Sequence, residues 1–167
     1  MRTKNSYEIR AEKFVKQIMP FLFNCQTVED YSIAVRMFNT RYHRSVIMAH
    51  GLTRIALITS DYVIKFDYNP AEVEIFGGCE DECAIYAEAK LAGFDYLFAK
   101  ISRVEVNGRY FYIMPRINGV GKYYEDAQDY MTEDECDWVL TRVFDLHWRN
   151  YGWKNNHVVL IDYSAHY

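Results

Sequence analysis

Residues 145–150 read DLHWRN, and this stretch decides how the whole chain is interpreted. It follows a run predicted to be helical, which opens at a Thr132 cap and continues to about Phe144. Asp145 lies five residues before Asn150 in what the composition predicts to be a loop. A carboxylate that takes the proton of a hydroxyl, together with an amide oxygen that ligates a metal ion, suits phosphoryl transfer. A polar turn that ends a helix is the structural alternative.

A second carboxylate closes the last apolar run of the chain. Residues 158–161 read VVLI and predict a buried strand, with Asp162 at its end. A carboxylate in this place contributes little to stability unless it meets a cation, and Mg²⁺ prefers hard oxygen ligands. Asp162 is therefore a candidate metal ligand, with a capping or turn aspartate as the alternative.

A lysine interrupts an earlier apolar strand, YVIKF at residues 62–66. Taken alone, Lys65 would be a solvent-facing or edge-strand residue. The functional alternative is a lysine that points into a cleft and holds phosphate oxygens, positioned by a carboxylate of the next helix. That helix is predicted over residues 79–92, and Glu82 is the first choice for the carboxylate, with Glu88 second.

The order of the elements predicts an α+β fold. Two helices come first, three strand runs follow, and a helix precedes two strands joined by Asn107-Gly108, the strongest short hairpin signal. This order predicts an antiparallel sheet with one helix packed on it. The predicted helices cover 7–22 and 28–38, and the predicted strands cover 46–49, 54–59, 62–66, 99–106, 109–117, 151–153 and 158–162. We divide the chain into an N-terminal helical extension (1–45), a sheet domain (46–118) and a shorter C-terminal part (119–167).

Composition and charge limit the classes of protein that fit. The chain has 167 residues, half of them hydrophobic, which suits one folded domain. The net charge of −4 argues against binding to nucleic acid through phosphates, although local basic clusters such as Arg36, Arg41, His43 and Arg44 remain. No apolar run approaches the roughly 20 residues that span a bilayer, and residues 1–5 lack the apolar stretch of a signal peptide. The four cysteines do not follow zinc-site spacing, and we expect a cytoplasmic protein.

The motifs together resemble the protein-kinase-like superfamily. Residues 62–65 match the V-A-I-K strand, residues 145–150 match the end of H-R-D-L-x-x-x-N, and residues 162–164 lie where D-F-G would be. The form D-L-H-x-x-N is closest in style to aminoglycoside-phosphotransferase-like kinases and to small bacteriophage-encoded Ser/Thr kinase-like proteins. The resemblance implies a minimal kinase-like fold, in which the sheet domain is the N-terminal lobe and the C-terminal lobe is much reduced.

The resemblance also implies a role for each motif residue, with ATP and Mg²⁺ as cofactors. Lys65 would hold the α- and β-phosphates and pair with Glu82. Asp145 would be the catalytic base, and Asn150 and Asp162 would bind Mg²⁺. The resemblance implies that His147 stabilises the transferred charge. It also implies that the loop covering the nucleotide contains Gly51, Thr53 and Arg54, and that the hinge meeting adenine contains Met114 and Arg116.

The sequence also departs from the family pattern. The covering loop keeps only Gly51, Val143-Phe144 replaces His-Arg, and the chain ends five residues after Asp162. Two functions therefore stay open. The first is an ATP- and Mg²⁺-dependent Ser/Thr protein kinase, phage-encoded, that phosphorylates a host protein or itself. The second is a weak or inactive kinase-like module that inhibits a host protein through exposed aromatic residues, with Tyr123, Tyr124, Tyr130, Trp148 and Trp153 as candidates. A homodimer or a host partner is a way to complete the fold, and no membrane contact is expected.

Overall fold

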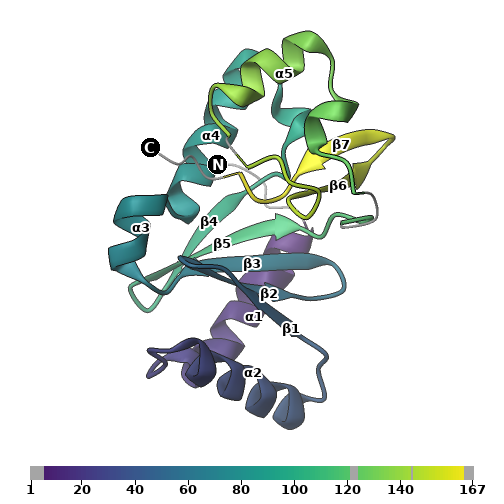
Figure 1. Cartoon of the computed structure of the whole chain (residues 1–167). Coiled ribbons are helices and arrows are strands. Elements are labelled where there is room, and N and C mark those ends of the chain that lie inside the picture. Colours follow the sequence, from purple (N-terminus) through teal and green to yellow (C-terminus); the bar gives the residue numbers. More distant parts are fainter. Residues whose placement is uncertain (1–5, 121–123, 144, 164–167) are drawn as a thin grey trace. The chain divides into compact units, whose positions relative to one another are not determined.

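The computed structural model describes residues 6–120, 124–143 and 145–163 (Figure 1). Helices and strands are both present, which confirms the α+β class. The helices are α1 (Ser6–Leu22), α2 (Val28–Tyr42), α3 (Pro70–Phe76), α4 (Cys79–Ala92) and α5 (Glu133–Leu140), with short 3₁₀ helices η1 (Asp95–Leu97) and η2 (Ala127–Tyr130). The strands are β1 (Ile47–His50), β2 (Arg54–Ile58), β3 (Tyr62–Asp67), β4 (Ser102–Val106), β5 (Arg109–Pro115), β6 (Tyr151–Lys154) and β7 (His157–Leu160).

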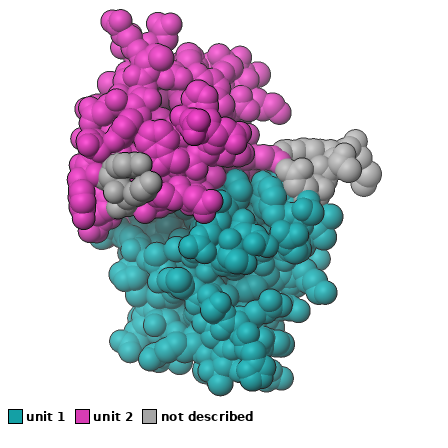
Figure 2. Space-filling view, turned by 90° about the vertical axis from the view of Figure 1, so that its right-hand side faces the viewer, with its two compact units in different colours: residues 1–70, 102–116 teal, residues 71–101, 117–167 magenta. Residues whose placement is uncertain are grey.

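The chain forms two compact units, which Figure 2 colours separately. The first consists of residues 1–70 and 102–116, and the second of residues 71–101 and 117–167. The first 45 residues therefore belong to the same unit as the sheet. Within the described ranges, no helix is both long enough and apolar enough to cross a membrane.

The first unit contains a five-stranded antiparallel sheet in the order β1-β2-β3-β5-β4. Its β4–β5 hairpin turns at Asn107 and Gly108, whose φ angles of 54° and 76° are the positive values that this turn requires. The predicted antiparallel sheet and hairpin are thus confirmed. The prediction that the fourth strand begins at Ala99 was wrong. The Ala99 N–H donates to the Leu160 carbonyl at 2.8 Å, so this segment pairs with β7 before β4 begins.

Helices α1 and α2 cover one face of this sheet. Phe14 of α1 packs edge-on against Phe38 of α2 and Tyr62 of β3, with ring centroids 5.3 and 6.0 Å apart. Ile64 and Phe66 of β3 belong to the same core. Because side chains alternate along a strand, Lys65 lies on the opposite face of the sheet. The N-terminal helices therefore stabilise the sheet without covering the face that carries this lysine.

The ends of two helices differ from the predictions. Thr27 and Asp30 form the expected capping box of α2, but the helix continues past Phe38 and ends at His43, whose φ is 50°. Helix α5 ends at Leu140, well before the predicted end near Phe144, which lies outside the described residues. The Thr141 hydroxyl donates to the Trp138 carbonyl at 2.9 Å, which satisfies an acceptor at the end of the helix.

The second unit contains α3, α4, α5 and a two-stranded β6–β7 hairpin. Helix α4 has the predicted bounds. At its start, the Gly78 N–H donates to the Asp81 carboxylate at 2.6 Å, and Gly93 ends it at a φ of 83°. Asp81 thus caps the start of this helix. Helix α3 was not predicted, although Pro70 at its first position is a recognised start signal.

Gly152 in β6 is a position where a side chain cannot be accommodated. A Cβ atom there would lie 2.6 Å from the Asn118 carbonyl oxygen and 2.7 Å from the Ile117 side chain. We expect Gly152→Ala to lower the free energy of unfolding by about 2–3 kcal/mol, because the backbone at Asn118 must move. Urea denaturation measures the change. A loss as small as that of Gly51→Ala, where a Cβ would meet nothing within 4 Å and φ is not in the left-handed region, would contradict the packing argument.

Candidate active site

The loop after α5 folds back on itself and fixes the position of Asp145. The Asp145 carboxylate accepts a hydrogen bond from the His147 N–H at 3.2 Å, the turn that aspartate commonly forms with the backbone two residues on. The Asn150 side chain donates to the Asp145 carbonyl at 3.2 Å, and the Asn150 N–H donates to the His147 carbonyl at 2.7 Å. The loop is anchored by the Ala127 N–H, which donates to the carbonyl of buried Leu146 at 2.9 Å. Asp145 itself is exposed, and its role as a catalytic base stays a prediction.

The strand end that carries Asp162 lies beside this loop. The Asn150 carbonyl accepts from the Ile161 N–H at 2.8 Å and from the Asp162 N–H at 3.4 Å. The structure therefore brings together Asp145, Asn150 and Asp162, which are separated in sequence. The amide nitrogen of Asn150 is used as a donor, so its Oδ1 is the atom suited to ligate a cation.

These two oxygen donors fit a magnesium ion. Mg²⁺ commonly takes one or two protein oxygens and completes its shell with water and substrate phosphates. Among residues 6–120, 124–143 and 145–163, no three His, Cys, Asp or Glu side chains gather as a cation site. A magnesium ion held by Asn150 and Asp162 would therefore draw its remaining ligands from a nucleotide and water.

Glu82 of α4 is fully buried and is hydrogen-bonded to Tyr163, the residue that follows Asp162. One of its carboxylate oxygens accepts from the Tyr163 N–H at 3.3 Å. The Tyr163 hydroxyl donates to the Ala99 carbonyl at 2.7 Å. Burial, followed by the neighbouring charge of Glu82, raises the pKa of Tyr163 well above its ordinary value, so it stays a neutral donor. Glu88, the second choice, is exposed and pairs with Arg142 at 3.0 Å.

The predicted phosphate-binding lysine lies in the first unit. Lys65 is 7% exposed and pairs with Ala56 of β2 and Tyr112 of β5 in the sheet register. Burial of a lysine is costly unless its charge is compensated, so this position is unlike that of an ordinary solvent-facing strand lysine. The pairing of Lys65 with Glu82 stays a prediction.

The predicted nucleotide-covering loop is the tight turn between β1 and β2. The Gly51 N–H donates to the Arg54 carbonyl at 2.9 Å, and the Tyr68 N–H donates to the carbonyl of buried Thr53 at 3.0 Å. The Tyr68 hydroxyl also donates to the Gly51 carbonyl at 3.1 Å. These hydrogen bonds use the Gly51 N–H and the carbonyls of Gly51, Thr53 and Arg54. Contact of this turn with a nucleotide stays a prediction.

A Gly51→Ala variant separates a structural role of this glycine from a role in binding. A Cβ at Gly51 would meet nothing within 4 Å, and its φ is not in the left-handed region. We expect the free energy of unfolding to change by less than about 0.5 kcal/mol. If phosphates approach this backbone closely, the affinity for ATP should fall by about tenfold. Calorimetry on the folded variant measures it, and unchanged affinity would remove Gly51 from the site.

The predicted hinge residues are held by the sheet and by a turn. Met114 is buried and pairs with Val63. The Arg116 N–H donates to the Asp61 carbonyl and its guanidinium to the Thr59 carbonyl, both at 3.0 Å. The backbone donor at Arg116 is therefore already in use. Contact of Met114 and Arg116 with adenine stays a prediction.

Aromatic side chains surround the loop that carries Asp145. Trp148 packs against Tyr124 and His147, with ring centroids 5.0 and 5.1 Å apart, and the Arg149 guanidinium lies 4.6 Å from the Trp148 ring. The His147 Nδ1 accepts from the Arg149 N–H at 3.4 Å, so a neutral His147 carries its proton on Nε2. Tyr124 is 82% exposed. Two other candidates, Tyr130 and Trp153, pack against each other at 4.9 Å, and Tyr123 lies outside the described residues.

Comparison with solved structures gives likenesses at low sequence identity. No protein-family model matches the chain, and no curated protein matches it. A solved structure described as a streptomycin-ATP-APH(2″)-IIa ternary complex is 17% identical, with a TM-score of 0.32. The match covers 64% of this chain and 34% of that protein, so this chain spans about a third of its length. We base the functional proposal on the residues of this chain and not on that likeness.

Proposed function

We propose that this chain is an ATP- and Mg²⁺-dependent phosphotransferase of the kinase-like type. Its acceptor is a Ser or Thr hydroxyl on a protein, either a host protein, if the chain is phage-encoded, or the chain itself. The hydrogen bonds that join Asp145, Asn150 and Asp162 are the observation that carries this proposal. A polar turn that merely ends a helix has no need of a neighbouring strand-end carboxylate.

In the proposed reaction, Asp145 accepts the proton of the acceptor hydroxyl while that oxygen bonds to the γ-phosphorus of ATP. The bond from the γ-phosphorus to the bridging oxygen breaks, and ADP leaves. The turn to the His147 N–H orients the Asp145 carboxylate for this role. Lys65 supplies positive charge to the phosphates. Asn150 and Asp162 would hold the magnesium ion, which neutralises charge on the phosphate oxygens when bound.

The test is transfer of γ-labelled phosphate from ATP and Mg²⁺ by the purified chain, with host-cell extract as a source of acceptors. Lys65→Ala and Asp145→Ala serve as comparison variants. Labelling by the wild type that both substitutions abolish supports the proposal. A folded wild-type protein that labels nothing above the two variants contradicts it.

A second function is favoured by the aromatic pair of exposed Tyr124 and partly exposed Trp148. Large aromatic side chains are over-represented in protein interfaces, and Arg149 adds a cation beside them. A kinase-like module that binds and inhibits a host protein would use this surface without turnover. Pull-down from extract with the wild type and with Trp148→Ala tests this function. A partner that the wild type captures, that Trp148→Ala loses and that is not labelled with phosphate from ATP supports inhibition over the first function.

A further inference from the structure

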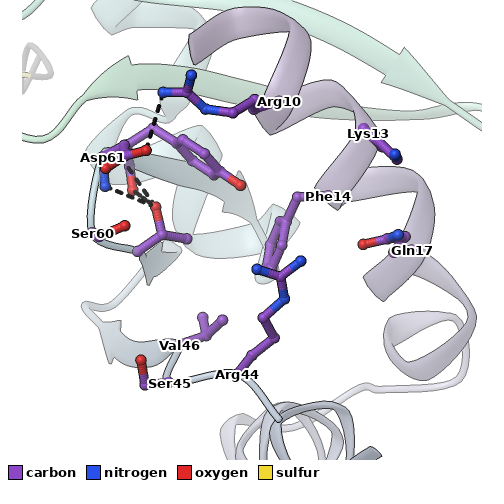
Figure 3. Close-up of a pocket in the computed structure, with 11 residues that line it drawn as sticks. Arg10, Lys13, Phe14, Gln17, Arg44, Ser45, Val46, Ser60 and Asp61 are labelled. Atoms are coloured by element: carbon purple, nitrogen blue, oxygen red, sulfur yellow. Dashed lines mark hydrogen bonds and ion pairs between the residues drawn. The ribbon is translucent and has the colours of Figure 1, made fainter. Parts of the chain in front are cut away.

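The first unit contains a pocket that none of the predicted kinase residues line. It lies between α1, the segment 44–46 and the turn 59–62, and it encloses about 370 Å³. Arg10 and Lys13 come from α1, and Arg44 comes from the segment after α2 (Figure 3). We call this the Arg10–Lys13–Arg44 pocket. Its volume is in the range of small-ligand sites.

The charges around this pocket do not balance. Its lining has three cationic side chains and a single carboxylate, Asp61, which pairs with Arg10 at 3.0 Å. In the described part of the chain, neither Lys13 nor Arg44 forms an ion pair with a carboxylate. The Arg10–Asp61 pair is half-exposed, and such pairs contribute little, so Arg10 can be shared with a ligand. The concentration of positive charge stands out in a chain of net charge −4.

The cationic side chains come from different walls of the pocket. Figure 3 shows Arg44 extending toward Phe14, with Lys13 on the α1 side and Ser60 on the opposite side. Burial raises the pKa of Tyr62, and the charges of Arg44 and Arg10 act against that rise.

The walls that carry these groups are rigid. The Asn39 side chain forms two hydrogen bonds with the backbone of Val46. It donates to the Val46 carbonyl at 2.9 Å and accepts from the Val46 N–H at 3.0 Å. The Arg44 N–H donates to the Asn39 carbonyl at 3.0 Å. The opposite turn is closed by the Thr59 hydroxyl, which donates to the Tyr62 carbonyl at 2.8 Å. The backbone that carries Arg44 and the turn opposite it are therefore fixed by hydrogen bonds, and only the exposed side chains need to be ordered by a ligand.

We infer that the Arg10–Lys13–Arg44 pocket binds the phosphate group of a small phosphomonoester. Two arginines offer planar, multi-donor groups that match phosphate oxygens, and three cations suit a dianion better than a carboxylate. The hydroxyls of Ser45 and Ser60 add further hydrogen-bonding groups to the lining. Phe14 and Val46 provide an apolar wall for the organic part of the ligand.

The test uses phenyl phosphate as the probe, with binding to the wild-type chain followed by calorimetry and by amide chemical shifts. We expect saturable binding with a Kd on the order of 1 mM, and weaker binding of inorganic phosphate, which leaves the apolar wall unused. Arg44→Ala and Lys13→Ala should each raise Kd at least about fivefold. Arg36→Ala is the matched control, because Arg36 is an exposed arginine of the same unit that does not line the pocket.

Three outcomes would overturn the inference. The first is the absence of saturable binding of phenyl phosphate up to about 20 mM. The second is that Arg36→Ala weakens binding as much as Arg44→Ala and Lys13→Ala do. The third is loss of phenyl phosphate binding in Lys65→Ala, which would place the phosphate in the predicted nucleotide site. Both pocket variants replace exposed side chains and should fold normally, which a melting curve verifies. A free phosphoserine and a short phosphoserine peptide then distinguish a small metabolite from a phosphorylated chain as the source of the group.

Discussion

Asp145→Asn is expected to lower the rate of phosphoryl transfer by about 10²–10⁴-fold, the contribution typical of a positioned general base. Asparagine keeps the side-chain oxygen that accepts from the His147 N–H, so the loop should keep its conformation. What the variant loses is the ability to take up the acceptor proton. Affinity for ATP should stay within about threefold of the wild type, because this residue acts on the acceptor hydroxyl.

The matched control for this variant is Asp137→Asn. Asp137 is an exposed aspartate of α5 in the same unit, and its replacement changes the net charge by the same amount. Single-turnover transfer of labelled phosphate gives the rate for both variants, and calorimetry gives the affinity for ATP. If Asp145→Asn is slowed no more than Asp137→Asn, then Asp145 is a turn residue and the proposed mechanism fails.

Local sequence signals predicted the elements that local interactions build. The turn Asn107-Gly108, the cap at Thr132 and the start of α4 after Gly78 each depend on a few adjacent residues, and each occurs as expected. The start of β4 was wrong because Ala99 pairs with Leu160, a partner far along the chain. Periodicity within a short window cannot contain that information.

The sequence indicated candidates for the site, but it could not indicate how they are joined. The sequence order of Asp145, Asn150 and Asp162 singled these residues out, and their chemistry stays a prediction. The Asn150 carbonyl that links the two segments is a backbone group with no sequence signature. The Arg10–Lys13–Arg44 pocket was missed for a similar reason. We grouped Arg44 with Arg36 and Arg41 by proximity in sequence, but α2 ends at His43 and the following segment carries Arg44 to a different surface.

Glu82 offers the second test with a large expected effect, because its two roles can be separated. One role is structural: the buried carboxylate accepts from the Tyr163 N–H, next to Asp162. Glu82→Ala removes that acceptor and opens a cavity, so we expect the free energy of unfolding to fall by about 2–4 kcal/mol. Urea denaturation measures the loss. A fall of less than about 0.5 kcal/mol would show that the hydrogen bond to Tyr163 is unimportant.

The other proposed role of Glu82 is electrostatic, because the kinase-like resemblance assigns it to the phosphate-binding lysine. Glu82→Gln keeps an oxygen that can accept from the Tyr163 N–H but removes the negative charge. We expect this variant to fold with nearly wild-type stability and to transfer phosphate about 10–100-fold more slowly. Glu88→Gln is the control, since Glu88 is an exposed glutamate of the same helix. If Glu82→Gln instead transfers phosphate at the wild-type rate while Glu82→Ala unfolds readily, the carboxylate serves only to hold Tyr163 and the strand end in place. In that case Lys65 must be oriented by another group, and the kinase-like assignment of Glu82 is wrong even if the chain is a phosphotransferase.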